Sequence, residues 1–146
     1  MTRQPLTKQN VLIVVPALNE AASIGEVLSS LKEHGHPTVV VSDGSVDATA
    51  DIARASGVAV LELAINLGVG GALRAGFQYA CRHGYEAIIQ VDADGQHPVS
   101  HIDKLIAAAN DLNADMVVGS RFADGTSTMS VSGVRRVTMQ VLAWSA

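Results

Sequence analysis

Short apolar runs alternate with helical patterns along this chain, and this alternation constrains its fold more than any other feature. Five runs are predicted to be strands: 11–15, 38–41, 58–63, 87–91 and 115–119. Continuous apolar runs rich in β-branched residues are typical of strands buried on both faces of a sheet. Strands that alternate with helices predict an α/β fold, with a mostly parallel sheet and helices on both of its faces.

Helix signals separate the predicted strands. Residues 23–26 match a capping box, which predicts a helix that ends at Gly35. Asp47 is expected to cap the next helix. A third helix is predicted over 71–83, where Cys81 shares a helical face with apolar residues and is expected to be buried.

Composition excludes several classes of protein. The chain has 146 residues, 48% hydrophobic and 16% charged, which fits a globular domain and not a disordered one. Its net charge of -4 argues against a protein that coats nucleic acid. A single cysteine forms no intramolecular disulfide, and no apolar run reaches the length of a membrane span. We therefore expect one cytoplasmic domain over 1–146, and a fragment of a longer protein because the chain stops in mid-pattern.

Polar residues follow every predicted strand at the end where ligands bind in parallel sheets. They are Asn19, Glu20, Asp43, Asn66, Asp92, Asp94, Ser120 and Arg121. Scattered surface polarity would not fall at each strand end. The sequence therefore predicts one binding site along this edge of the sheet.

The segment Asp92-Ala-Asp-Gly-Gln96 carries two carboxylates and an amide directly after a predicted strand. Oxygen ligands of this kind suit Mg²⁺ or Mn²⁺, and a nucleoside diphosphate would complete the coordination. The alternative is an Asx turn in which Asp92 and Asp94 only cap the loop and the following helix. Arg121, after the last predicted strand, would fit a phosphate.

The other polar positions have two interpretations each. Asp43 could accept hydrogen bonds from a base or ribose, with Gly44 permitting close approach, or it could belong to an ordinary turn. Glu20 could hold ribose hydroxyls or interact with a helix dipole. Asp47 is better explained as a helix cap. The glycine-rich stretch 66–74 is not a Walker loop, and tight packing of a helix on a strand is favoured over anion binding.

Taken in order, five segments resemble motifs of the family 2 glycosyltransferases with the GT-A fold. The resemblance is to the branch with dolichyl-phosphate mannosyltransferase and undecaprenyl-phosphate sugar transferases in particular. The segments begin with Pro16-Ala-Leu-Asn-Glu20, similar to Pro-x-x-Asn-Glu, and continue at 41–49, 66–77, 92–98 and 119–122. Each motif alone is short, but five in one order form a specific pattern. One departure is Ser42, which stands where the family has the first Asp of an Asp-Asp pair.

This resemblance implies a Rossmann-like GT-A fold and a metal-dependent inverting transferase. The donor would be a UDP- or GDP-linked sugar and the acceptor a polyprenyl phosphate, reached at the cytoplasmic face of a membrane. The implied nucleotide-sugar residues are Pro16, Leu18, Glu20, Val41, Asp43, Asp92, Ala93, Asp94 and Arg121. Asp92, Asp94 and Gln96 would hold Mg²⁺ or Mn²⁺. Asp94 and Arg121 would carry catalysis by stabilising charge on the departing diphosphate.

Two other functions are compatible with parts of the pattern. A phosphatase of the haloacid-dehalogenase type also places Asp-x-Asp-Gly after a buried strand, but it expects Thr at the position of Gln96 and the motif near the N-terminus. Alternatively, the chain is a catalytically silent module that binds a nucleotide sugar and lacks the acceptor-binding C-terminal part.

Overall fold

One parallel sheet forms the centre of the molecule. The computed structural model describes residues 4–96 and 98–119. The strands are β1 (Val11–Ala17), β2 (Thr38–Asp43), β3 (Ala59–Leu63) and β4 (Ala87–Gln90). Their spatial order is β3-β2-β1-β4, and all three pairings are parallel. In the register, Val14 of β1 lies opposite Val39 of β2 and Gln90 of β4. The predicted α/β fold is therefore confirmed.

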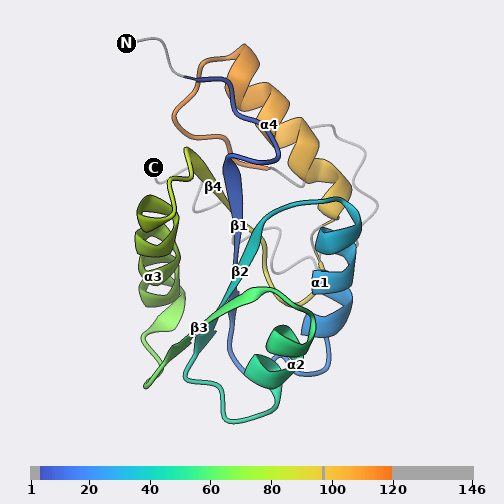
Figure 1. Cartoon of the computed structure of the whole chain (residues 1–146), viewed down its shortest axis with the longest axis vertical. Coiled ribbons are helices and arrows are strands. Elements are labelled where there is room, and N and C mark those ends of the chain that lie inside the picture. The colour runs from blue at the N-terminus through green and yellow to red at the C-terminus, as the bar shows by residue number, and fades with distance from the viewer. Residues whose placement is uncertain (1–3, 97, 120–146) are drawn as a thin grey trace, which may run out of the picture.

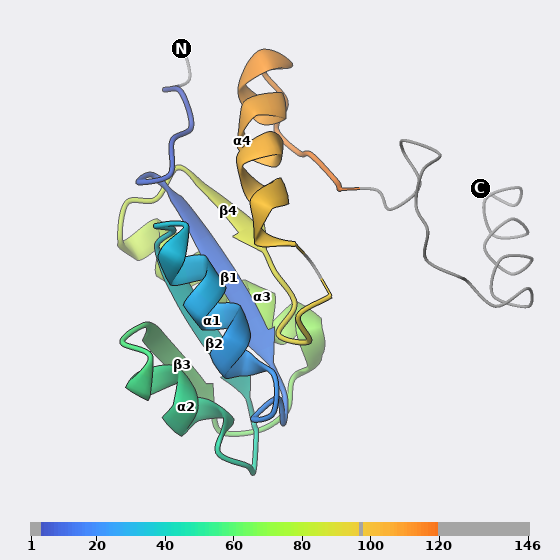
Figure 2. The ribbon, with the colours of Figure 1, turned by 90° about the vertical axis from the view of Figure 1, so that its right-hand side faces the viewer.

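Helices cover both faces of this sheet. They are α1 (Ile24–Glu33), α2 (Thr49–Ala55), α3 (Gly68–Arg82), the 3-10 turn η1 (Val99–His101) and α4 (Ile102–Asp111). Helices α1 and α2 lie on one face and α3 lies on the other, as Figures 1 and 2 show from two directions. None of the helices in the described ranges is long and apolar enough to cross a membrane.

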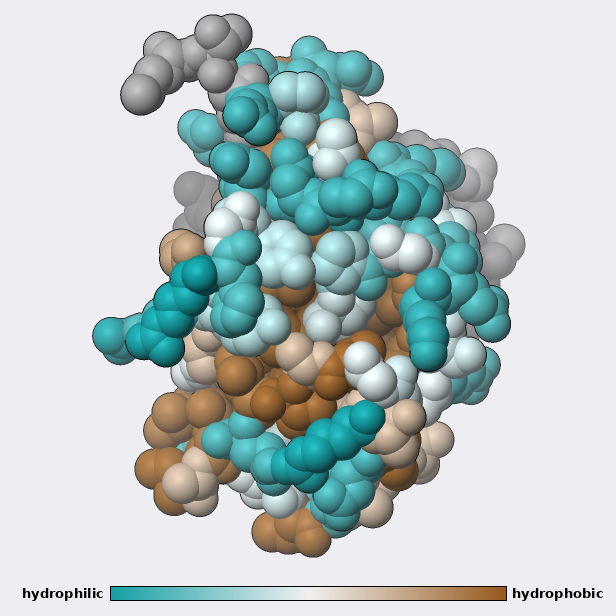
Figure 3. Space-filling view, viewed as in Figure 1, coloured by the Kyte–Doolittle hydropathy of each residue, from teal (hydrophilic) through white to brown (hydrophobic). Residues whose placement is uncertain are grey.

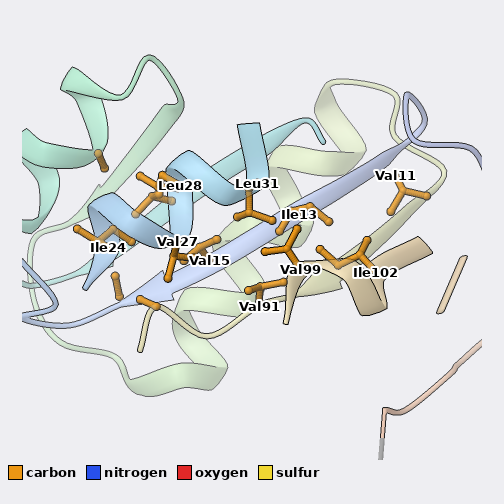
Figure 4. Packing of buried hydrophobic residues seen from close by; sticks show 14 of the residues in the cluster. Val11, Ile13, Val15, Ile24, Val27, Leu28, Leu31, Val91, Val99 and Ile102 are labelled. Carbon is orange, nitrogen blue, oxygen red and sulfur yellow. The ribbon is translucent and has the colours of Figure 1, made fainter. Parts of the chain in front are cut away.

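The larger core lies between α1 and the sheet. Figure 4 shows Leu31 of α1 close to Ile13 of β1, in the cluster that also contains Leu28 and Val15. Each of these side chains is at most 1% exposed. Burial of an aliphatic side chain of this size contributes about 1.5–3 kcal/mol, so this contact anchors the helix that follows the first strand.

On the opposite face, α3 packs through its smallest residues. Ala72, Gly76 and Ala80 form the buried stripe of this helix. A Cβ atom at Gly76 would lie 2.4 Å from Val14 Cγ1, so the helix backbone approaches β1 as closely as a side chain allows. Phe77, one turn before Cys81, is 47% exposed, and Cys81 is exposed as well. The prediction that Cys81 is buried is wrong, because small residues and not large ones mark the packed face.

Two further predictions about local structure are wrong. Residues 115–119 form no strand: Met116 and Val118 are 81% and 73% exposed. An apolar run becomes a strand only beside a neighbouring strand, and within the described ranges none pairs with it. At α1, the Ser23 hydroxyl donates to Glu20 Oε2 (2.8 Å) and makes no capping bond to the helix, so the capping box is absent although the helix forms.

A buried histidine, His36, lies just before β2, at the amino end of that strand. The His36 side chain is fully buried, and neither ring nitrogen has a hydrogen-bond partner. Nε2 lies 3.6 Å from Asp103 Oδ1 on α4, while Lys8 Nζ binds the other carboxylate oxygen at 3.0 Å. Burial lowers the pKa of His36 below 6.5, and the charges of Lys8 and His34 lower it further, against the opposing effect of Asp103. The folded protein therefore favours the neutral form of this ring.

His36→Leu is expected to raise the melting temperature, and to raise it more at about pH 5.5 than at about pH 7.5. The substitution removes two buried polar atoms without partners. Below the ordinary pKa of 6.5, the unfolded wild-type chain binds a proton that the folded chain resists, so wild-type stability falls as pH falls. Thermal unfolding at both pH values tests this, with the exposed His101→Gln as control. A difference from wild type that does not change with pH would contradict the argument.

Candidate functional site

A cleft of about 370 Å³ opens at the carboxyl ends of the strands. The strands run from the top toward the bottom of Figure 1, and this edge of the sheet lies at their lower ends. The lining residues are Pro16, Ala17, Leu18, Glu20, Asp43, Asn66, Gly68, Val69, Ala72, Asp92, Ala93 and Asp94. They come from the segments after β1, β2, β3 and β4, so the cleft depends on the whole sheet.

Most residues predicted to bind a nucleotide sugar meet in this cleft. Those that line it are Pro16, Leu18, Glu20, Asp43, Asp92, Ala93 and Asp94. Val41 is fully buried in the core under α3 and does not line the cleft. Gln96 is exposed outside the lining, and Ser120 and Arg121 lie outside the described residues. The binding roles of all these residues, Val41, Gln96 and Arg121 included, stay predictions.

The first residues of α3 contribute lining residues that sequence reasoning did not assign to the site. Gly68, Val69 and Ala72 lie in the cleft wall, whereas the glycine-rich stretch was interpreted as a packing feature. Helix α3 begins at Gly68, earlier than the predicted Gly71. The position of these residues after a strand at the ligand-binding edge was the signal that could have found them.

Asp43 joins two loops of the site. Its side chain is 4% exposed, and its Oδ1 accepts a hydrogen bond from Leu67 N at 2.8 Å. Next to it, Gly44 has a φ of 73°, and a Cβ atom there would lie 2.7 Å from Asn66 N. The close approach that Gly44 permits is thus to the β3–α3 segment. Asp43 therefore lines the cleft and, through its bond from Leu67 N, also holds the β3–α3 segment.

Both interpretations of Glu20 describe part of its environment. It lines the cleft, and its carbonyl accepts from Ser23 N (3.1 Å) and Ile24 N (2.9 Å) at the start of α1. Its carboxylate accepts from the Ser23 hydroxyl at 2.8 Å. The carboxylate therefore lies beside the N-terminus of α1 and at the cleft at the same time.

The loop after β4 supplies oxygen ligands of the kind that hard cations prefer. Asp92 is half-buried and Asp94 is exposed, and both line the cleft. Asp92 Oδ1 accepts from Gln90 Nε2 (2.9 Å), and Asp94 Oδ1 accepts from Gln96 N (2.9 Å). The second of these bonds forms the Asx turn that sequence reasoning gave as the alternative. The turn leaves the other oxygen of Asp94 without a hydrogen bond among the described residues.

These carboxylates fit Mg²⁺ or Mn²⁺ only as an incomplete ligand set. In the part of the chain that the structure describes, no group of three His, Cys, Asp or Glu residues could hold a metal ion. Mg²⁺ is commonly bound through one or two carboxylates together with substrate phosphates and water. Asp92 and Asp94 are two carboxylates of that kind, and a bound phosphate compound and water would have to supply the remaining ligands.

Apolar side chains flank the carboxylates. Pro16, Leu18 and Val69 line the cleft beside Asp43 and Asp94, and Leu18 and Val69 are 42% and 60% exposed. Apolar surface also gathers in the lower half of Figure 3, the half in which β3 ends in the same view. Apolar walls with a few placed polar groups are typical of sites for small organic ligands.

Comparison with known proteins identifies the family. The model of the family described as "Glycosyl transferase family 2" matches residues 12–143, most of the chain. The chain belongs to glycosyl transferase family 2. It is therefore a glycosyltransferase-family chain with a GT-A-like fold, as the five motifs predicted.

Two curated relatives in this family transfer to lipid phosphates, by their names. Polyprenol monophosphomannose synthase of Mycolicibacterium smegmatis is 32% identical over 126 residues, which cover 80% of this chain and 47% of the relative. Undecaprenyl-phosphate mannosyltransferase of Micrococcus luteus is 36% identical over 122 residues, 79% of this chain and 49% of the relative. The chain thus spans about half the length of these relatives.

A solved structure of another enzyme has a similar fold. Glucosyl-3-phosphoglycerate synthase from Mycobacterium tuberculosis, solved with Mn²⁺, UDP and glucosyl-3-phosphoglycerate, superimposes with a TM-score of 0.58. The sequences are 26% identical, and the match covers 69% of this chain and 39% of the synthase. The same enzyme has also been solved with Mg²⁺ and UDP.

Proposed function

We propose that this chain is the donor-binding part of an inverting transferase that moves a sugar from a nucleotide sugar to a polyprenyl phosphate. The observation that carries the proposal is the cleft, because it is lined by residues from separate sequence motifs that were each predicted to bind a nucleotide sugar. Pro16, Glu20, Asp43, Asp92 and Asp94 come from three strand ends that are distant in sequence. The proposed reaction transfers a sugar from a nucleotide to a lipid phosphate, so we assign it to the cytoplasmic face of a membrane.

The nucleoside and the diphosphate of a nucleotide sugar match different parts of the cleft. The apolar walls of Pro16, Leu18 and Val69 suit the flat face of a base, and Glu20 and Asp43 supply acceptors for base and ribose donors. Asp92 and Asp94 would hold Mg²⁺ or Mn²⁺ against the diphosphate. A cation bound there supplies charge neutralisation on the leaving diphosphate.

The proposed transfer needs few groups from the protein. A phosphate oxygen of the acceptor attacks the anomeric carbon, the bond from that carbon to the donor diphosphate breaks, and the nucleoside diphosphate leaves. The attacking oxygen is already anionic, so no general base is required. The protein holds the donor in place, excludes water with its apolar walls and stabilises the leaving group. Arg121 is assigned to that last role, together with the cation that Asp94 would hold.

Similar proteins support the substrate classes. The names of the Mycolicibacterium and Micrococcus relatives contain a polyprenol or an undecaprenyl phosphate with mannose. The M. tuberculosis synthase has been solved with UDP-glucose and Mn²⁺. These properties belong to longer proteins, and for this chain they define the compounds to test.

Titration of the purified chain with UDP, GDP and their common sugars, with and without Mn²⁺, is expected to detect binding of one nucleotide that requires the cation. Calorimetry measures the affinity, and ATP is the control ligand. A folded chain that melts cooperatively and binds neither UDP nor GDP would contradict the proposal. Addition of a polyprenyl phosphate and a radiolabelled donor then tests transfer, and binding without transfer would favour the silent nucleotide-sugar-binding module.

A further inference from the structure

Three consecutive backbone N–H groups of the β1–α1 loop donate to side chains of the β2–α2 loop. The pairs are Asn19 N to Ser45 Oγ (3.1 Å), Glu20 N to Thr49 Oγ1 (2.8 Å) and Ala21 N to Asp47 Oδ2 (3.1 Å). In return, Val46 N donates to Asn19 Oδ1 at 2.9 Å. We call Asn19, Ser45, Asp47 and Thr49 the loop clamp. Four hydrogen bonds therefore join the two segments.

The acceptors in the clamp are themselves held in place. Asp47 Oδ1 accepts from both the N–H (3.0 Å) and the hydroxyl of Thr49, which leaves Oδ2 for Ala21 N. The hydroxyl bond from Thr49 lowers the pKa of the Asp47 carboxyl below its ordinary value, so the acceptor is charged at neutral pH. Thr49 is fully buried at the start of α2, so its hydroxyl has a fixed position.

The clamp determines the conformation of two cleft residues. Asn19 lies between Leu18 and Glu20, which line the cleft, and has a φ of 56°. A left-handed conformation is uncommon for a residue with a side chain, and Asn adopts it when local hydrogen bonds compensate. Neither Asp47 nor Thr49 lines the cleft. Both act on the cleft only through the backbone that carries Leu18 and Glu20.

We propose that Asp47 and Thr49 are positioning residues for nucleotide binding, which hold the β1–α1 loop so that Leu18 and Glu20 face the ligand. This inference rests on the proposed function, because it assigns the nucleoside to that wall of the cleft. It differs from the prediction of Asp47 as a helix cap: the N-cap of α2 is Ala48, and Asp47 accepts hydrogen bonds from Thr49 N, at the first residue of that helix, and from Ala21 N of the site loop.

Thr49 offers a matched pair of variants. Thr49→Val keeps the shape of the side chain and removes the hydroxyl, so the Glu20 N–H loses its acceptor and Asp47 loses a donor. Thr49→Ser keeps the hydroxyl and leaves a small cavity where the methyl group was buried. We expect Thr49→Val and Asp47→Ala to weaken binding of the nucleoside diphosphate about tenfold in the presence of Mn²⁺. Thr49→Ser should stay within about twofold of wild type although its melting temperature falls.

A control separates positioning from general stability. Asn110 makes two hydrogen bonds to the backbone of Leu6, each 2.8 Å, away from the cleft. Asn110→Ala should lower the melting temperature and leave nucleotide affinity unchanged. All variants are made in the full chain and measured by calorimetry and thermal unfolding.

The outcomes distinguish this inference from the proposed function. If wild type binds and affinity falls in Thr49→Val and Asp47→Ala but not in Thr49→Ser or Asn110→Ala, the positioning role is supported. If wild type binds and Thr49→Val binds equally well, the positioning role is overturned while the proposed function stands. If wild type binds neither UDP nor GDP, the proposed function fails and the positioning role fails with it.

Discussion

Asp94→Asn is expected to weaken nucleoside diphosphate binding in Mn²⁺ by roughly 100-fold, to the level that wild type shows with EDTA. Loss of a partner that only orients a metal ligand already costs roughly 10–100-fold in affinity, and Asp94 is proposed as a ligand itself. The asparagine carbonyl can still accept the hydrogen bond from Gln96 N, so the Asx turn and the fold should remain intact. Calorimetric titration with UDP and GDP, with Mn²⁺ or with EDTA, measures the effect.

Asp111→Asn is the matched control for this change. It removes the same charge from an exposed residue at the end of α4, outside the cleft lining. Its affinity and melting temperature should equal those of wild type. If Asp94→Asn keeps both the affinity and the dependence on Mn²⁺, the metal-site proposal is wrong.

Gly44→Ala is expected to lower the free energy of unfolding by roughly 2–5 kcal/mol and to abolish nucleotide binding. A side chain at a φ of 73° costs about 1–2 kcal/mol in backbone strain. The new methyl group would also lie 2.7 Å from Asn66 N and 2.8 Å from the Ile65 carbonyl carbon, and overpacking adds about 1–3 kcal/mol. Moving these backbone atoms would displace the β3–α3 segment, in which Leu67 N donates a hydrogen bond to Asp43. Urea unfolding and nucleotide titration measure both effects.

Gly57→Ala separates the two causes. Gly57 has a φ of 80°, and a Cβ atom there would have no neighbour within 4 Å. In Gly57→Ala the free energy of unfolding should fall only by the cost of backbone strain, about 1–2 kcal/mol. The variant should bind nucleotide as wild type does. Equal losses of stability in the two variants would contradict the proposed contact between Gly44 and the β3–α3 segment.

The parts of the fold that repeat a pattern were predictable from sequence. The strand at 11–15 was predicted because burial on both faces of a sheet requires a continuous apolar run. The end of the first helix was predicted because Gly35 can adopt the left-handed conformation in which many helices end. Residues 115–119 carry a similar apolar run but form no strand, since pairing depends on a neighbour that no local signal reveals. Cys81 was misplaced because the closeness of α3 to β1 is a property of two elements and not of one.

The site was predictable where chemistry and topology coincide. Asp43, Asp92 and Asp94 each follow a strand, and parallel strands bring such positions to one edge. Val69 was missed because an aliphatic residue carries no chemical signal. The bonds from Thr49 and Asp47 to the β1–α1 loop were missed as well, because they join backbone groups to side chains across 29 and 26 residues of sequence.

The order of the strands has a consequence for how the chain is made. Strands β3, β2 and β1 can pair as soon as they leave the ribosome, but β4 joins the free edge of β1 only after α3 has crossed the sheet. Until then, the apolar run of β1 is an unprotected edge, a site at which nascent chains pair with one another. Asp92 and Asp94 are synthesised after that protecting strand. A growing chain therefore acquires the two aspartates proposed to hold the cation only after the strand that shields β1 has been made.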